Sequence, residues 1–141
     1  MRTDNHRLDW YESLSVGVPS IDEQHKRLIA LTDKLFQAIM DDVGKTVMGD
    51  VLNELADYTT YHFGHEEQLL LEHGYPEDLF AEHQYEHQVL TTKVHELIGE
   101  HERNASCLDL TVYEFLRDWT TEHMKGTDSQ YSDFLIKRGV R

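Results

Sequence analysis

The chain has 141 residues, of which 39% are hydrophobic, so we expect residues 1–141 to form a single domain with a proper core. Thirteen basic against 27 acidic residues give a net charge of −14, which repels nucleic acid and anionic membrane surfaces and excludes both as expected partners. No run approaches the roughly 18 apolar residues of a membrane span, and the polar start lacks the apolar stretch of a signal peptide, so we expect a cytoplasmic protein.

Residues 1–19 carry no strong helix signal and are expected to form an extended arm. The stretch 20–23 reads Ser-Ile-Asp-Glu, the pattern of a capping box, so the first long helix is predicted over about residues 21–42, with Gly44 ending it. Its apolar residues recur in alternating steps of four and three, which mark one face of a helix. His25 lies within that face.

Two more helices are predicted over about residues 46–73 and 77–103, with Gly74 as a left-handed cap residue between them. Residues four apart on a helix project side by side from one face. Each of the two helices places such a pair of metal-binding residue types on its inward face, namely His62 with Glu66 and His83 with His87.

A fourth helix is predicted over about residues 110–125, after a turn at residues 104–109. Its metal-type residues, His123 and Asp128, are five positions apart, which a regular helix would turn roughly 140° off a common direction. They can converge only if the backbone departs from a regular α-helix near Gly126.

Four helices with short connections favour an all-α fold, an antiparallel up-down-up-down four-helix bundle. We place the extended N-terminal arm at residues 1–19 and the bundle at residues 20–137. A short C-terminal helix, predicted within residues 128–137, completes the bundle end.

One histidine on an apolar face is usually a core residue bonded to a neighbour. Here, however, all four predicted helices carry metal-type residues on their apolar faces. Burying five imidazoles and two carboxylates without partners would cost several kcal/mol per charged group, and the net stability of a small domain is only ~5–15 kcal/mol. The single cysteine, Cys107, excludes a Cys-x-x-Cys site, so the metal ligands must be nitrogen and oxygen atoms. The predicted two-metal site consists of His25, His62, Glu66, His83, His87, His123 and Asp128.

Imidazole ligands suit zinc, copper, iron and nickel, whereas carboxylates that bridge two ions suit iron or manganese, so the ligand set favours iron. Neither a Glu-x-x-His nor a His-Glu-x-x-His sequence occurs, which argues against the ferritin-like di-iron and the zinc protease sites. Five histidines against two acids favour reversible redox over oxidation of a substrate.

With this ligand pattern the chain resembles the hemerythrin family, and specifically its single-domain bacterial members. The match covers nearly the whole chain and includes Trp10 and the stretches 16–25, 62–67, 74–76, 83–87 and 119–131. The resemblance implies two non-haem iron ions with a bridging oxo or hydroxo group. It assigns His83, His87 and His123 to one iron, His25 and His62 to the other, and Glu66 and Asp128 to the bridges.

By this assignment the iron with two histidines has one open position, where dioxygen would bind. Thr120 stands where well-studied oxygen carriers of the family have leucine. Its hydroxyl either bonds back to a helix carbonyl, or hydrogen-bonds the bound oxygen or admits solvent, which would speed autoxidation. The residues that match the family's pocket are Phe63, Trp119, Thr120, Met124 and Tyr131.

The expected function is reversible dioxygen binding for storage, delivery or buffering. An oxygen or redox sensor is the first alternative, but sensors usually carry a fused signalling module, for which the residues after His123 leave no room. A di-iron peroxidase or nitric oxide reductase ranks third, because no acid or base beyond the ligands is evident. A redox or signalling protein partner and the oligomeric state stay open.

Overall fold

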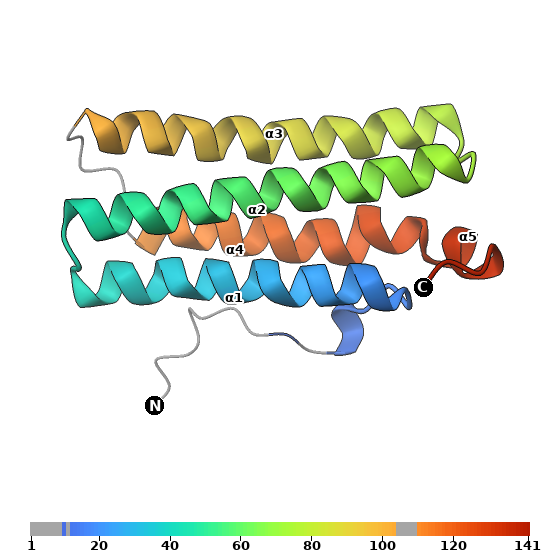
Figure 1. Ribbon diagram of the computed structural model, residues 1–141, viewed down its shortest axis with the longest axis horizontal. Coiled ribbons are helices and arrows are strands. Elements are labelled where there is room, and N and C mark those ends of the chain that lie inside the picture. The colour runs from blue at the N-terminus through green and yellow to red at the C-terminus, as the bar shows by residue number, and fades with distance from the viewer. Residues whose placement is uncertain (1–9, 11, 104–109) are drawn as a thin grey trace.

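The computed structural model describes residues 10, 12–103 and 110–141. Its four long helices run antiparallel, and α1 and α3 each pack against both α2 and α4 (Figure 1). They are α1 (Pro19–Asp41), α2 (Lys45–Glu72), α3 (Glu77–Glu102) and α4 (Leu110–His123). The predicted all-α bundle with up-down-up-down topology is confirmed, whereas the turn predicted at 104–109, with Cys107, lies outside the described residues.

The capping box predicted at the start of α1 is wrong. The helix begins at Pro19, so Ser20 already lies in the first turn, and Val18 precedes the helix without a side-chain cap. Proline suits this position because its fixed φ is helical and its missing N–H would have no partner in the first turn. At the other end α1 stops at Asp41, before Gly44 is reached, and Asp42 caps it in the left-handed conformation with φ 52°.

The helix irregularity predicted near Gly126 is confirmed. Residues Met124–Asp128 form one π-helical turn between α4 and the short helix α5 (Ser132–Lys137). A π-helical turn brings residues five apart onto one side of the helix. Nε2 of His123 therefore lies 3.0 Å from Oδ1 of Asp128.

The arm predicted before the bundle includes one short 3₁₀ turn, Glu12–Leu14. The carboxylate of Asp22 in the first turn of α1 accepts hydrogen bonds from the Ser15 hydroxyl at 2.5 Å and the Val16 N–H at 2.9 Å. These bonds fold the arm back against α1, and Leu14 is buried as a result. The rest of the arm, residues 1–9 and 11, lies outside the described part of the chain.

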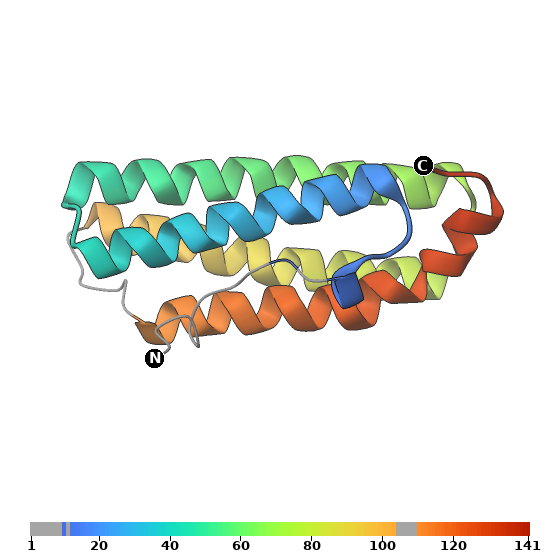
Figure 2. The same cartoon turned by 90° about the horizontal axis from the view of Figure 1, so that it is seen from below.

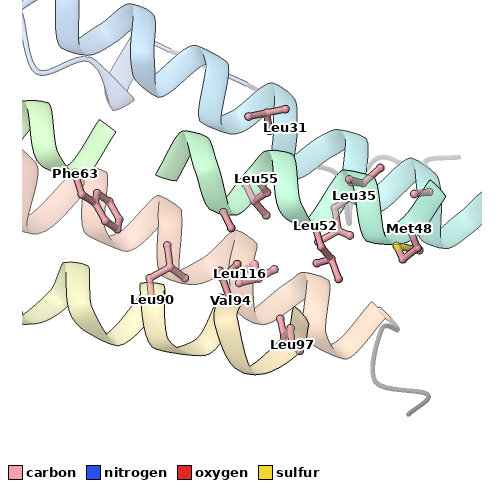
Figure 3. Packing of buried hydrophobic residues seen from close by; sticks show 13 residues of the cluster. Leu31, Leu35, Met48, Leu52, Leu55, Phe63, Leu90, Val94, Leu97 and Leu116 are labelled. Carbon is pink, nitrogen blue, oxygen red and sulfur yellow. The ribbon is translucent and has the colours of Figure 1, made fainter. Parts of the chain in front are cut away.

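Two apolar clusters lie on either side of the metal-type residues along the bundle. The larger one fills the bundle interior with side chains from all four helices, among them Leu35, Leu52, Leu97 and Leu116 (Figure 3). The smaller one joins the start of α1 to α5 at the bundle end (Figure 2). The predicted ligands lie between these two clusters along the bundle, so apolar packing flanks the site on both sides. None of the described helices is long and apolar enough to span a membrane.

Gly17 joins the arm to α5 through a close contact. Its φ is +73°, and an added Cβ would lie 2.7 Å from Cδ1 of Ile136. We predict that Gly17→Ala lowers the free energy of unfolding by about 0.5 kcal/mol more than Gly74→Ala does, because Cδ1 is the end of an exposed side chain that can shift at a small cost. Gly74 is the matched control, because its φ of +77° imposes the same backbone strain while an added Cβ would meet no atom within 4 Å. Urea denaturation measures both variants, and equal losses would contradict the close packing of the arm on α5.

Candidate metal centre

The structure brings all seven predicted ligand residues together inside the bundle. Each of them is at most 5% exposed. Each of the helices α1, α2, α3 and α4 contributes at least one buried ligand residue at the same height along the bundle axis. The π-helical turn after α4 contributes the remaining one, Asp128. The seven residues are His25, His62, Glu66, His83, His87, His123 and Asp128.

The potential ligand atoms fall into two groups that share the two carboxylates. Within each group, one ligand atom from every residue lies within 4.8 Å of all the others. The first group contains Glu66, His83, His87, His123 and Asp128, and the second contains His25, His62, Glu66 and Asp128.

Each carboxylate turns one oxygen toward each group. Oε1 of Glu66 lies 3.2 Å from Nε2 of His83 and 3.0 Å from Nε2 of His87. Its Oε2 lies 3.4 Å from Nε2 of His25 and 3.5 Å from that of His62. This is the arrangement of a carboxylate that can bridge two cations.

Asp128 repeats the pattern from the other side of the cluster. Its Oδ1 lies 3.0 Å from Nε2 of both His83 and His123, and its Oδ2 lies 3.1 Å from Nε2 of His25. The two carboxylates therefore offer four oxygens to two positions, one flanked by three imidazoles and the other by two.

Many polar atoms of this cluster have no hydrogen-bond partner although they are buried. Buried polar groups in proteins are almost always paired, and an unpaired one costs free energy. Here the unpaired atoms face one another across the centre, which fits a site that holds cations rather than a hydrogen-bonded core. They include Nε2 of His25, His87 and His123 and both carboxylate oxygens of Asp128.

Outside the cluster, three histidines are held by polar side chains on neighbouring helices. Nδ1 of His62 lies 2.7 Å from Oε1 of Gln24, Nδ1 of His87 lies 2.7 Å from Oε2 of Glu67, and Nδ1 of His123 lies 2.7 Å from Oε1 of Glu86. A carboxylate or amide at Nδ1 fixes the ring and directs Nε2 to the centre. The sequence analysis gave these three partners no role.

The pKa values of three histidines are raised in the structure. Burial lowers the pKa of His25, but Asp128 and Glu66 outweigh it and raise the pKa to about 9. Burial also lowers the pKa of His83, but Asp128 and Glu66 outweigh it and raise the pKa to about 10. For His123, burial is outweighed by Asp128 together with Glu86 and Glu66, which raise the pKa to about 9. The cluster thus strongly attracts positive charge.

The two carboxylates respond in the opposite direction. Burial acts to raise the pKa of Glu66, but the charge and hydrogen bonds of the imidazoles hold it well below its usual range. The same holds for the pKa of Asp128, despite the nearby charge of Glu66. Both side chains are therefore ionised acceptors with no exposed surface.

Four of the five predicted pocket residues line a cavity that opens from the ligand cluster into the bundle interior. They are Phe63, Trp119, Thr120 and Met124. Phe63 stacks on the ring of His87 at 3.7 Å, and Trp119 stacks on the ring of His123 at 4.6 Å, so these two rings shield ligand side chains from solvent.

Tyr131 lies elsewhere, in the apolar cluster at the bundle end. Its hydroxyl donates a hydrogen bond of 2.5 Å to Oε2 of Glu66, which orients that carboxylate. Burial and the nearby charges of Asp128 and Glu66 raise the pKa of Tyr131 well above its usual range, so it stays a donor.

Comparison with known proteins agrees with this geometry. The family model described as the hemerythrin HHE cation binding domain matches residues 16–135. The chain is 32% identical over 126 residues to a bacteriohemerythrin of Stenotrophomonas maltophilia, covering 89% of this chain and 80% of that protein. It is 27% identical to a hemerythrin-like protein of Naegleria gruberi, covering 91% and 93% of the two chains.

Solved structures give the same result for the fold. A crystal structure of wild-type hemerythrin superimposes with a TM-score of 0.78 at 25% identity, covering 94% of this chain and 95% of that one. A crystal structure of a leucine-to-alanine mutant of hemerythrin superimposes with a TM-score of 0.82 at 26% identity, covering 90% and 96%.

The raised pKa values predict how stability depends on pH. A histidine whose pKa is higher in the folded chain contributes stability that is fully present below its unfolded value of about 6.5 and is lost as pH rises through the folded value. For His25, His83 and His123 the loss falls between about pH 6.5 and 10.

We therefore predict that urea denaturation finds the metal-free protein less stable at pH 10 than at pH 6.5. In the metal-loaded protein the imidazoles are neutral ligands over this range, so this loss should disappear. Equal stability of the metal-free protein at both pH values would contradict the electrostatics described here.

Proposed function

This chain belongs to the hemerythrin family, and from that premise we propose that it binds dioxygen reversibly at a centre of two non-haem iron ions joined by an oxo or hydroxo bridge. The observation that carries the proposal is the sharing of Glu66 and Asp128 between a group of three histidines and a group of two. Two carboxylates that each turn one oxygen to either group fit a pair of adjacent cations.

We assign His83, His87 and His123 to one iron, His25 and His62 to the other, and the two carboxylates to both. The unequal number of histidines leaves the second iron with fewer protein ligands, which makes it the position for dioxygen. When bound, the iron pair supplies the two electrons that dioxygen takes up on binding and returns on release.

The residues around the ligands keep the centre rigid. Gln24, Glu67 and Glu86 fix three imidazoles through Nδ1, and Thr127 donates a hydrogen bond of 2.7 Å to Glu86. Because the carboxylates of Glu67 and Glu86 both act on the side with three histidines, they make those imidazoles the stronger electron donors. Tyr131 holds Glu66 in the same way from the bundle end.

The cavity walls support binding over catalysis. Phe63, Trp119 and Met124 form an apolar wall that separates the ligand side of the cavity from bulk solvent and external reductants, which reversible binding needs. In the part of the chain that the structure describes, the titratable residues lining this cavity are all proposed ligands: His25, His62, His123 and Asp128. A peroxidase or nitric oxide reductase would need a further acid or base there.

A sensing role would use the same binding of dioxygen and would differ only in the partner protein that responds to it. Sensing therefore stays the alternative to storage, delivery or buffering, and the cytoplasmic location stays a prediction. So does the division into a single domain of residues 1–141, with an arm at 1–19.

The proposal predicts a reversible optical change. Iron-loaded protein, reduced without air, should gain a visible absorption band in air, lose it under argon, and gain it again over several cycles. His62→Ala should abolish the band because it removes a ligand from the side that binds dioxygen. His95→Ala is the matched control, because His95 is exposed and outside the cluster, and it should leave the band unchanged.

Irreversible oxidation at the first exposure to air would contradict reversible binding. Turnover of added hydrogen peroxide under the same conditions would favour the enzyme alternative instead.

A further inference from the structure

One helical turn from the histidines, toward the bundle interior, the helices contribute a layer that alternates leucine and threonine. Each residue of the layer lies three positions from a proposed ligand, which is about 4.5 Å along the helix axis. All four are at most 8% exposed and line the same cavity. They are Leu28 on α1, Thr59 on α2, Leu90 on α3 and Thr120 on α4.

The two threonines line the same cavity from two different helices, α2 and α4. Each of α2 and α4 packs mainly against α1 and α3, so the two helices lie diagonally opposite (Figure 2). Thr59 and Thr120 therefore bring two hydroxyls to opposite sides of a cavity whose other wall residues at this level are leucines.

Neither hydroxyl is used by the protein itself. Threonine in a helix commonly donates to the carbonyl four residues earlier, and Thr32 and Thr121 do so at 2.9 Å. Among the described residues, by contrast, no hydrogen bond is formed by the hydroxyl of Thr59 or of Thr120. The alternative in which Thr120 only bonds back to its own helix is therefore wrong.

The cavity has room for one water molecule. Over its whole length, from the ligand side chains to the leucines beyond the two threonines, the cavity gives the centre of a water molecule about 20 Å³ of free space, and a single buried water needs roughly 10–15 Å³ by this measure. A buried water also needs two to four polar partners, and the two hydroxyls supply the minimum. Leucine at either position would remove one partner and fill part of the space.

We propose that Thr59 and Thr120 together bind one water molecule in this cavity, and that the water donates a hydrogen bond to dioxygen bound beside His25 and His62. The first half of the proposal concerns the cavity alone, whereas the second half rests on the proposed function. The hydroxyl pair is thus a determinant of how the oxygen-bound form behaves.

The water has a consequence for the lifetime of that form. Full oxidation of the ferrous pair by dioxygen takes one electron from each iron and two protons from solvent, and it releases hydrogen peroxide with both irons ferric. A water molecule in the cavity provides a path for those protons. A cavity without it should oxidise more slowly.

The test is the double variant Thr59→Val with Thr120→Val, which keeps the shape of both side chains and removes both hydroxyls. In crystals of the iron-loaded diferric protein, we expect a water within about 3.2 Å of both hydroxyls in the parent chain and none in the variant. The oxygen-bound variant should decay slower by about three- to tenfold, because the water and its hydrogen bond no longer assist the protonation and release of peroxide.

Two controls separate the hydroxyls from packing. Thr60→Val with Thr121→Val makes the same chemical change one position further along each helix, where Thr60 is exposed and Thr121 bonds its own helix, and should change neither readout. Serine at positions 59 and 120 keeps both hydroxyls and should retain the water. If the double valine variant does not fold, Thr120→Val alone should lower the water occupancy, because one of two partners is lost.

A dry cavity in the parent chain, or a water that persists in the valine variant, would overturn the proposal. A water that is present while valine leaves the decay rate unchanged would overturn its second half. The crystals contain diferric protein and need no bound dioxygen. The presence or absence of the water can therefore still be determined if reversible oxygen binding fails.

Discussion

The burial of two ionised carboxylates is the constraint on which the rest of the structure depends. Glu66 and Asp128 are 0% exposed, and isolated charges in such a place cost more than a small domain can offset. Five imidazoles surround them, yet several facing nitrogen and oxygen atoms form no hydrogen bond. Cations between these atoms remove the conflict, so metal binding and folding are linked in this chain.

The bundle meets this constraint through regular helices and one local exception. Steps of four residues suffice on α2 and α3, but Asp128 reaches the centre only through the π-helical turn after His123. The arm and α5 then close the bundle end, and Tyr131 in that end cluster also holds Glu66. The packing that stabilises the end of the bundle is thereby also the packing that orients the Glu66 carboxylate.

Features that repeat along one helix could be predicted from the sequence. The inward position of His25, the paired spacing on α2 and α3, and the irregularity near Gly126 each follow from the geometry of a single helix. Features that depend on the neighbouring helix could not. Gln24 and Glu86 bond histidines 38 and 37 positions away, which no periodicity reports.

Where the sequence-based prediction was wrong or incomplete, two local preferences competed at the same position. Ser20 and Glu23 have the capping pattern, but the helix starts at Pro19, two positions earlier than that pattern predicts. The role of Thr59 emerged only once a cavity joined α2 to α4, because threonine on an inward helix face usually bonds its own backbone.

The most direct test of the metal centre is anomalous diffraction at the iron absorption edge from crystals of iron-loaded protein. The account predicts two iron peaks, both contacting Glu66 and Asp128, with three histidines on one and two on the other. A single peak, or two peaks that do not share both carboxylates, would contradict it.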